Sequence, residues 1–204
     1  MTPRIFLVDD QAAVRKAMER LLTSAGYEAL AYESAQAFLA SGMCDAPGCL
    51  ILDLAMPAMD GLALQKALAG SLLPVIFLTG HGDVDSSVRA MKAGACDFLT
   101  KPVDASVLLA AVQAALDQNR KARAERADCD ELRARMDSLT PREAEVMALL
   151  IEGKLNKQIA DHLGIVEKTI KVHRARVLAK MKVRSSTALV RLVDRAQRER
   201  GAPE

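Results

Sequence analysis

Apolar and polar positions along the first half of the chain form two alternating kinds of segment. Short apolar runs bounded by turn residues predict buried strands of a parallel sheet, and segments with apolar residues at helical spacing separate them. The predicted strands are 4–8, 27–32, 49–53, 74–79 and 96–100. The predicted helices are 11–25, 34–41, 62–68, 84–93 and one that begins at 104. This alternation predicts a doubly wound α/β domain.

The second half of the chain is predicted to be helical. Its helices are expected from the Thr140 cap to Gly153, over 157–163 after an Asn156 cap, over 167–181, and from a Ser185 cap to Arg195. Thr140, Pro141 and Glu143 have the spacing of a capping box with proline at the first helical position. Two short helices joined by a turn at Gly164, the second of them basic, predict a helix-turn-helix.

The third of these helices has two distinct faces. Ile170, Val177 and Met181 share one face, with His173 between them, and are expected to pack inward. The opposite face is exposed and basic, which suits a DNA major groove. Spacing alone also allows a basic face that is merely solvated.

The segment between the two halves, residues 119–137, is expected to be a helical linker. The helix from 104 is predicted to run through 119 and on through 126. Leu132, Met136 and Leu139 continue an apolar seam, so a short coiled coil is one interpretation. A solvated connecting helix is the other, and the weak seam before Glu131 favours it. The expected domains are therefore 1–118 and 138–204, on either side of this linker.

Charge divides the chain in the same place. Residues 1–120 hold 9 Lys and Arg against 13 Asp and Glu, whereas residues 121–204 hold 19 against 13. An acidic front half and a basic back half indicate different partners, with nucleic acid for the second.

Cysteine spacing and hydropathy exclude several protein classes. The four cysteines form no C-x-x-C pair and have no histidine at zinc-ligand spacing, so reduced thiols are expected. No run approaches the roughly 20 apolar residues of a spanning helix. We therefore expect a soluble, cytoplasmic protein without membrane contact.

Five polar side chains follow the predicted strands directly: Asp9, Asp10, Asp53, Thr79 and Lys101. Taken alone, Asp53 could simply cap its strand. Because the carboxyl ends of parallel strands share one edge of a sheet, we expect all five side chains to converge there. Three carboxylates repel one another unless a cation sits among them, and oxygen ligands favour Mg²⁺. A lysine and a hydroxyl beside that ion are groups that a phosphoryl group needs.

Residues 1 to about 118 resemble a response-regulator receiver domain of flavodoxin-like (βα)5 fold. The segments that carry the resemblance are 6–10, 52–61, 78–84 and 90–102. The resemblance implies that Asp53 accepts a phosphoryl group from a sensor histidine kinase. It also implies that Asp10, Asp53 and the backbone carbonyl of Ala55 ligate Mg²⁺, with Asp9 acting mostly through water.

The same resemblance implies a switch. Lys101 would pair with one phosphoryl oxygen and Thr79 with another, and Phe98 would follow Thr79 between two rotamers. Many members of the family carry Tyr at this place, so the Phe98 switch would depend on packing alone; an ordinary core aromatic is the alternative. His81 is interpreted as loop structure rather than as a catalytic base.

Residues 139–146, 153–160 and 169–176 resemble the LuxR-type four-helix DNA-binding domain, and the whole chain resembles the FixJ/NarL-like subfamily. The resemblance implies that Lys171 and Val172 face bases, while other members of the set hold the DNA backbone. The expected set is Lys168, Thr169, Lys171, Val172, Arg174, Arg176 and Lys180. Val166 departs from the family, which usually has a capping serine there; losing such a cap typically costs about 1 kcal/mol.

Together these features predict a phosphorylation-dependent, DNA-binding transcriptional regulator of a two-component system. Phosphorylation would change the surface around residues 84–100, promote a homodimer and place two helix-turn-helices on duplex DNA; the resemblance favours an activator that works with RNA polymerase. An aspartyl-phosphate enzyme is a rival, but Ala55 stands where such enzymes carry a second acid. A receiver with a protein-binding or RNA-binding output is another rival.

Overall fold

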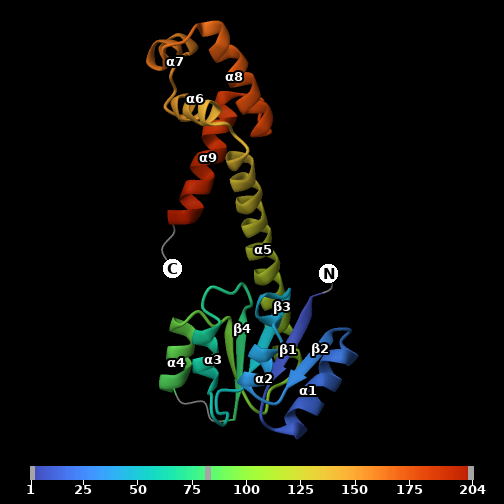
Figure 1. Cartoon of the computed structure of the whole chain (residues 1–204). Helices are drawn as coiled ribbons and strands as arrows, with labels where there is room; N and C mark the ends of the chain where they lie inside the picture. The colour runs from blue at the N-terminus through green and yellow to red at the C-terminus, as the bar shows by residue number, and fades with distance from the viewer. Residues whose placement is uncertain (1–2, 81–83, 202–204) are drawn as a thin grey trace. The chain divides into compact units, whose positions relative to one another are not determined.

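The N-terminal half of the chain is built on one parallel sheet. The computed structural model describes residues 3–80 and 84–201, which divide into two compact units, Met1–Ala124 and Glu125–Glu204. The strands lie in the order β2-β1-β3-β4-β5, and every pairing is parallel (Figure 1). Their bounds are β1 Arg4–Val8, β2 Glu28–Tyr32, β3 Gly48–Leu52, β4 Val75–Thr79 and β5 Asp97–Thr100. The predicted doubly wound α/β fold is confirmed.

Helices cover both faces of this sheet. They are α1 (Ala12–Ser24), α2 (Ala35–Ala40), the short 3₁₀ turn η1 (Met43–Asp45), α3 (Gly61–Ala67), α4 (Val84–Lys92) and α5 (Ala105–Asp137). Because successive strand residues point to opposite faces, Phe6 packs with α2, α3 and α4, whereas Ile5 packs with α1 and α5. Both side chains are fully buried. The two cores fix the sheet between two helical layers.

Helix α5 continues past the expected start of the linker. Asn119 is buried, accepts a hydrogen bond from the Gly48 N–H (3.1 Å) and donates one to the Leu72 carbonyl (2.5 Å). Arg123 donates to the Asn119 side-chain oxygen (3.1 Å) and to the Asp45 carbonyl. The bond to Gly48 gives a partner to a buried backbone N–H at the start of β3. The first turn of the expected linker is therefore attached to the N-terminal unit.

The C-terminal unit packs four helices, with one turn of α5, around a single core. The helices are α6 (Pro141–Ile151), α7 (Asn156–Leu163), α8 (Glu167–Lys180) and α9 (Ser186–Gly201). Ile170, Val177 and Met181 are fully buried in this core, as predicted. Leu132 of the expected apolar seam is buried in the same core. It packs within the C-terminal unit, so less apolar surface remains for a coiled coil. The predicted all-α helix-turn-helix unit is confirmed.

Two of the three predicted side-chain caps of this unit are confirmed. Thr140 and Glu143 form the capping box of α6, with bonds of 3.3 and 3.0 Å. Ser185 accepts from the Ala188 N–H (3.1 Å), and α9 continues to Gly201, beyond the expected end. The predicted Asn156 cap is wrong. Leu155 is the N-cap residue of α7, and the Asn156 side-chain oxygen accepts a hydrogen bond from Arg174 instead (3.0 Å).

Among the described residues, no helix has the length and apolar character that crossing a membrane requires.

Candidate functional site

An acidic site lies at the carboxyl edge of the sheet. The register of two neighbouring strands positions its residues. Val8 of β1 pairs with Leu52 of β3, and the Asp53 N–H donates to the Val8 carbonyl (2.8 Å). Asp9 and Asp53 therefore follow neighbouring strands side by side. Carboxylate oxygens of Asp9, Asp10 and Asp53 lie within 4.8 Å of one another. Asp9 and Asp53 are buried, whereas Asp10 is exposed.

Lys101 enters this site from β5. Its backbone N–H donates to the Thr79 carbonyl (2.8 Å), which fixes the chain between the two strand ends. Its ammonium nitrogen lies 2.6 Å from an Asp9 oxygen and 3.2 Å from an Asp53 oxygen. The predicted convergence of the acids and the lysine is thus confirmed. In this structure Lys101 also neutralises part of the repulsion between two buried carboxylates, a role that the sequence did not indicate.

Burial is the main influence on the pKa of the Asp53 carboxyl group. It raises this pKa above its ordinary value, and the nearby Lys101 ammonium offsets part of that effect. One carboxylate oxygen, Oδ2, faces Lys101. The other, Oδ1, is buried and accepts no hydrogen bond of ordinary geometry from the described residues. A buried acceptor without a partner is costly, so this oxygen is available to an incoming group or cation.

The residues of the site fit a divalent cation. Three carboxylates face one ammonium group, and all of their donor atoms are hard oxygens. The unpartnered Asp53 oxygen is the kind of ligand atom that Mg²⁺ accepts. The acidic cluster that receiver domains use for Mg²⁺ is therefore present.

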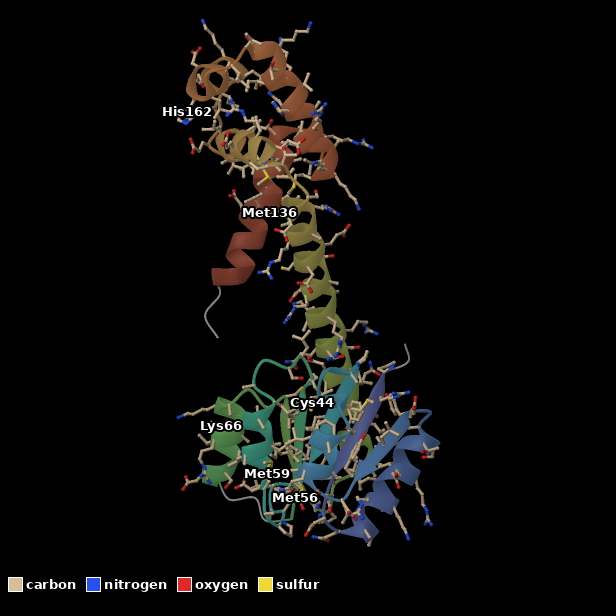
Figure 2. All side chains as sticks on the ribbon, in the orientation of Figure 1. Cys44, Met56, Met59, Lys66, Met136 and His162 are labelled. Atoms are coloured by element: carbon tan, nitrogen blue, oxygen red, sulfur yellow. The ribbon has the colours of Figure 1, made fainter. Side chains whose placement is uncertain are left out.

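The loop after β3 depends on Gly61. A Cβ atom there would lie 2.5 Å from the Asp53 carbonyl oxygen and 2.8 Å from the Phe77 ring, so only glycine fits without displacement. Figure 2 shows Met56 and Met59 of this loop at the end of the sheet opposite Cys44. Ala55 is exposed in the same loop, and its part in metal binding stays a prediction.

Arg15 is a site residue that sequence reasoning missed. Its guanidinium donates to the backbone carbonyls of Asp9 (2.7 Å) and Asp10 (2.9 Å) from the second turn of α1. The Gln11 N–H donates to the side chain of Asp9 (2.8 Å). Together these bonds hold the acidic loop against the start of α1. The sequence feature that could have indicated this role is the position of Arg15, about one and a half helical turns after the Asp9-Asp10 pair.

The expected switch residues lie where strand order places them. Thr79 is buried at the end of β4, and Phe98 of β5 is half-buried. The Phe98 ring packs against Phe77, with centroids 5.9 Å apart. Their movement on phosphorylation stays a prediction. His81 lies outside the described residues.

The C-terminal unit presents a basic face on α8, opposite the buried Ile170 and Val177. Four members of the expected DNA-contacting set are exposed on it: Lys168, Lys171, Val172 and Arg176. Thr169 and Arg174 are half-buried, and Arg174 ties α8 to α7 through Asn156. Such a face has the residue types that hold phosphates and reach base edges.

Lys180 has partners inside its own unit. Its ammonium group lies 2.6 Å from the carboxylate of Glu143 and 2.7 Å from the Ser138 carbonyl. The Lys180 hydrogen bond, with help from the Thr140 cap, lowers the pKa of Glu143 to about 2. Sequence reasoning recognised Glu143 only as a capping residue and missed this ion pair. Contact between Lys180 and DNA stays a prediction.

Comparison with known families accounts for both units. Residues 5–113 match the response regulator receiver domain, and residues 137–193 match the bacterial regulatory proteins of the luxR family. The chain belongs to the response-regulator family, in the branch with a LuxR-type DNA-binding domain. This response regulator is accordingly a phosphorylation-dependent transcriptional regulator of the two-component type and not an enzyme.

Relatives match this response regulator over nearly its whole length. Nodulation protein W of Bradyrhizobium diazoefficiens is 42% identical, covering 92% of this chain and 84% of the relative. Transcriptional regulatory protein FixJ of Rhizobium meliloti is 42% identical, covering 92% and 93%. The structure of the response regulator StyR superposes with a TM-score of 0.88 at 44% identity, covering 96% of this chain and all of StyR. Full-length FixJ from B. japonicum has a TM-score of 0.59 at 41% identity, covering 97% and 99%.

Proposed function

We propose that Asp53 is the phosphoryl acceptor of this response regulator and that a sensor histidine kinase is the donor. The observation that carries the proposal is the buried Asp53 carboxylate at the edge where Asp9 and Asp10 meet: its Oδ2 faces Lys101, and its Oδ1 has no hydrogen-bond partner among the described residues. In the transfer, an Asp53 oxygen forms a bond to phosphorus. The bond from phosphorus to the kinase histidine nitrogen breaks, and that nitrogen keeps the electron pair.

The neighbouring residues prepare Asp53 for this step. Lys101 favours the ionised form of a carboxyl group whose burial works against ionisation. As charge moves onto the phosphoryl oxygens, Lys101 and the Thr79 hydroxyl are proposed to donate to them from the same edge. We propose that Asp9, Asp10, Asp53 and the Ala55 carbonyl hold Mg²⁺, which when bound neutralises phosphoryl charge. Arg15 keeps the backbone of the two N-terminal aspartates in place.

We propose that phosphorylation acts on α4 and β5 and leads to a homodimer. Thr79 and Phe98 connect the acidic site with this region through β4 and β5. Val84, Val88 and Met91 of α4 are exposed by 76%, 44% and 47% and recur at helical spacing, which makes an apolar stripe. A dimer would cover this stripe and bring two α8 helices to adjacent half-sites.

The proposed output is sequence-specific binding of duplex DNA in the cytoplasm, followed by activation of transcription with RNA polymerase. Exposed Lys171 and Val172 are proposed to read bases; Lys168 and Arg176 are proposed to hold phosphates. Arg174 is proposed to reach the DNA backbone while it positions α7.

A phosphodonor experiment tests the acceptor. Incubation with phosphoramidate and Mg²⁺ should add one phosphoryl group to the wild type and to Asp45→Asn, an exposed carboxylate at the opposite edge of the sheet. Asp53→Asn should gain none, as read by intact-protein mass spectrometry. Equal incorporation by Asp53→Asn would rule out this residue as the acceptor.

Selection of bound DNA sites with and without phosphodonor tests the output. The phosphorylated wild type should enrich one sequence, and Val172→Ala should relax one position of it. Lys168→Ala should weaken all sites alike and reduce the salt slope by about 0.9, while Lys16→Ala on α1 should change nothing. Binding without any sequence preference would contradict the proposed output.

A further inference from the structure

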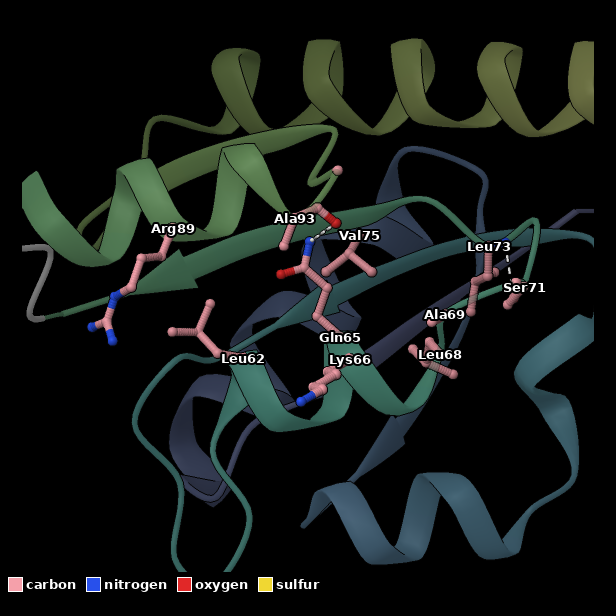
Figure 3. Close-up of a pocket in the computed structure, with 12 residues that line it drawn as sticks. Leu62, Gln65, Lys66, Leu68, Ala69, Ser71, Leu73, Val75, Arg89 and Ala93 are labelled. Atoms are coloured by element: carbon pink, nitrogen blue, oxygen red, sulfur yellow. Dashed lines mark hydrogen bonds between the residues drawn. The ribbon is translucent and has the colours of Figure 1, made fainter. Parts of the chain in front are cut away.

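A cavity lies between α3 and α4, on the helical layer that covers one face of the sheet. Its volume is about 750 Å³, within the range of small-molecule sites. Leu62, Leu68, Leu73 and Val75 give it apolar walls (Figure 3). Lys66 and Arg89 also line it, and no carboxylate does among the described lining residues. The acidic site at the strand ends does not contribute to it.

Gln65 is the polar residue at the back of this cavity. The residue is only 7% exposed, and its amide nitrogen donates to the carbonyls of Ala90 and Ala93, both at 3.1 Å. The Ala90 carbonyl lies in the last turn of α4 and also accepts from the Ala95 N–H (3.0 Å), whereas Ala93 directly follows the helix. Only the NH₂ end of the amide donates hydrogen bonds, so these two carbonyls determine the amide orientation.

That orientation leaves the Gln65 amide oxygen without a partner. The oxygen is buried and accepts no hydrogen bond from the described residues. Figure 3 shows it on the side of the amide that is turned away from Ala93, in the space between α3 and α4. A buried acceptor in this position is satisfied by a donor that enters the cavity.

We propose that this cavity binds a small organic anion that has an apolar body and one N–H or O–H donor. The apolar walls accommodate the body, the Gln65 oxygen accepts from the donor, and Lys66 and Arg89 attract the negative group. None of the described lining residues belongs to the acidic site around Asp53, so probe binding is tested without a phosphodonor.

A pair of matched fluorescent probes tests the proposal on the full chain. 6-Anilinonaphthalene-2-sulfonate has an aromatic body, one N–H and a sulfonate on the far side of the ring system; N-phenyl-2-naphthylamine has the same body and N–H without the charge. The anionic probe should bind the wild type about tenfold more tightly, the factor that one charge-assisted contact supplies. The double variant Lys66→Gln, Arg89→Gln should remove that preference. Lys92→Gln, an exposed α4 cation that does not line the cavity, should keep it.

Backbone NMR locates the probe. On binding, the amide signals of Gly70 and Gly94, which line the cavity, should shift, and that of Gly153 in the other unit should not. No saturable binding to the wild type, an anionic preference that survives the double variant, or shifts confined to other residues would each overturn the proposal. Circular dichroism of the double variant checks that both exposed substitutions leave the fold intact.

Discussion

The pKa values of two buried carboxyl groups, Asp53 and Glu143, shift in opposite directions because their surroundings differ. Burial outweighs the single cation near Asp53, so its pKa is raised, and one of its oxygens has no hydrogen-bond partner in the part of the chain that the structure describes. Glu143 is just as buried, but Lys180 and the Thr140 cap bind it, and its pKa falls to about 2. The first arrangement is suited to a reaction, and the second stabilises a fold.

Glu143 should make the stability of the C-terminal unit depend on acid pH. Its pKa is about 2 in the folded unit against an ordinary 4.5, so its contribution is complete above pH 4.5 and is lost as the pH falls towards 2. Glu143→Gln should therefore destabilise the unit strongly at pH 6 and by much less near pH 3. Hydrogen exchange of the α6 amides in the full chain measures the destabilisation at each pH. Glu145→Gln, on the exposed side of the same helix, is the control and should show little pH-dependent difference.

Gly61 should tolerate no side chain. Gly61→Ala places a Cβ atom against the Asp53 carbonyl and the Phe77 ring, and such overpacking should cost about 1–3 kcal/mol in urea unfolding. Gly80→Ala meets nothing within 4 Å and should change the free energy of unfolding by less than about 0.5 kcal/mol. Equal effects of the two substitutions would show that the close approach at Gly61 does not matter.

At the scale of elements, the helices differ in how their first turns are capped. Helix α3 begins at Asp60, whose side chain accepts from the Ala63 N–H (2.7 Å), and α6 begins with a complete capping box. Helix α8, which carries the basic face, begins at Val166 without any side-chain cap. The backbone of Val166 already has the extended conformation of an N-cap, with φ −75° and ψ 145°. Only the hydroxyl is missing.

Val166→Ser should therefore stabilise the start of α8. The Val166 side chain is 68% exposed, so its removal gives up little burial, and the new hydroxyl should add about 1 kcal/mol to the free energy of unfolding. Val166→Ala removes the same exposed side chain without supplying a cap, so it should not be stabilised. Thermal unfolding compares the two, and a serine variant no more stable than the alanine variant would contradict the capping argument.

At the scale of the whole molecule, the parallel sheet gathers the chemistry on one edge and the helical attachments on the other. The strand ends collect Asp9, Asp53 and Lys101, whereas Asn119 and Arg123 fasten α5 to loops that precede β3 and β4. In the proposed mechanism, a change at the acidic site reaches other surfaces through β4, β5 and α4. The apolar stripe on α4 is the exposed surface that we propose for the dimer contact.

Val88→Glu should strongly weaken the proposed phosphorylation-dependent dimer. A carboxylate in the middle of the apolar stripe would be buried without a partner in the dimer, and association should weaken by more than about tenfold. Light scattering with phosphoramidate present measures the mass, and intact-protein mass spectrometry checks that phosphorylation persists. Val107→Glu, at a similarly exposed position of α5, should still dimerise. Dimers of unchanged stability in Val88→Glu would place the interface elsewhere.

Local periodicity was sufficient to predict the five strands, the helical second half and the inward face of α8, because those patterns depend on residues a few positions apart. The convergence of Asp9, Asp10, Asp53 and Lys101 followed from one further rule, that parallel strands end at a common edge. Both kinds of prediction were confirmed.

Local periodicity could not predict which side chains pair over long sequence distances. Asn156 looked like a helix cap, but its oxygen binds Arg174, 18 residues away. Lys180 was expected to contact DNA, but its ammonium group binds Glu143, 37 residues away. A hydrogen bond depends on which groups the fold brings within about 3 Å, and local patterns do not contain that information. Periodicity thus determines the elements and the edge where the acids meet, whereas packing decides which polar groups are already paired and leaves the Asp53 oxygen open.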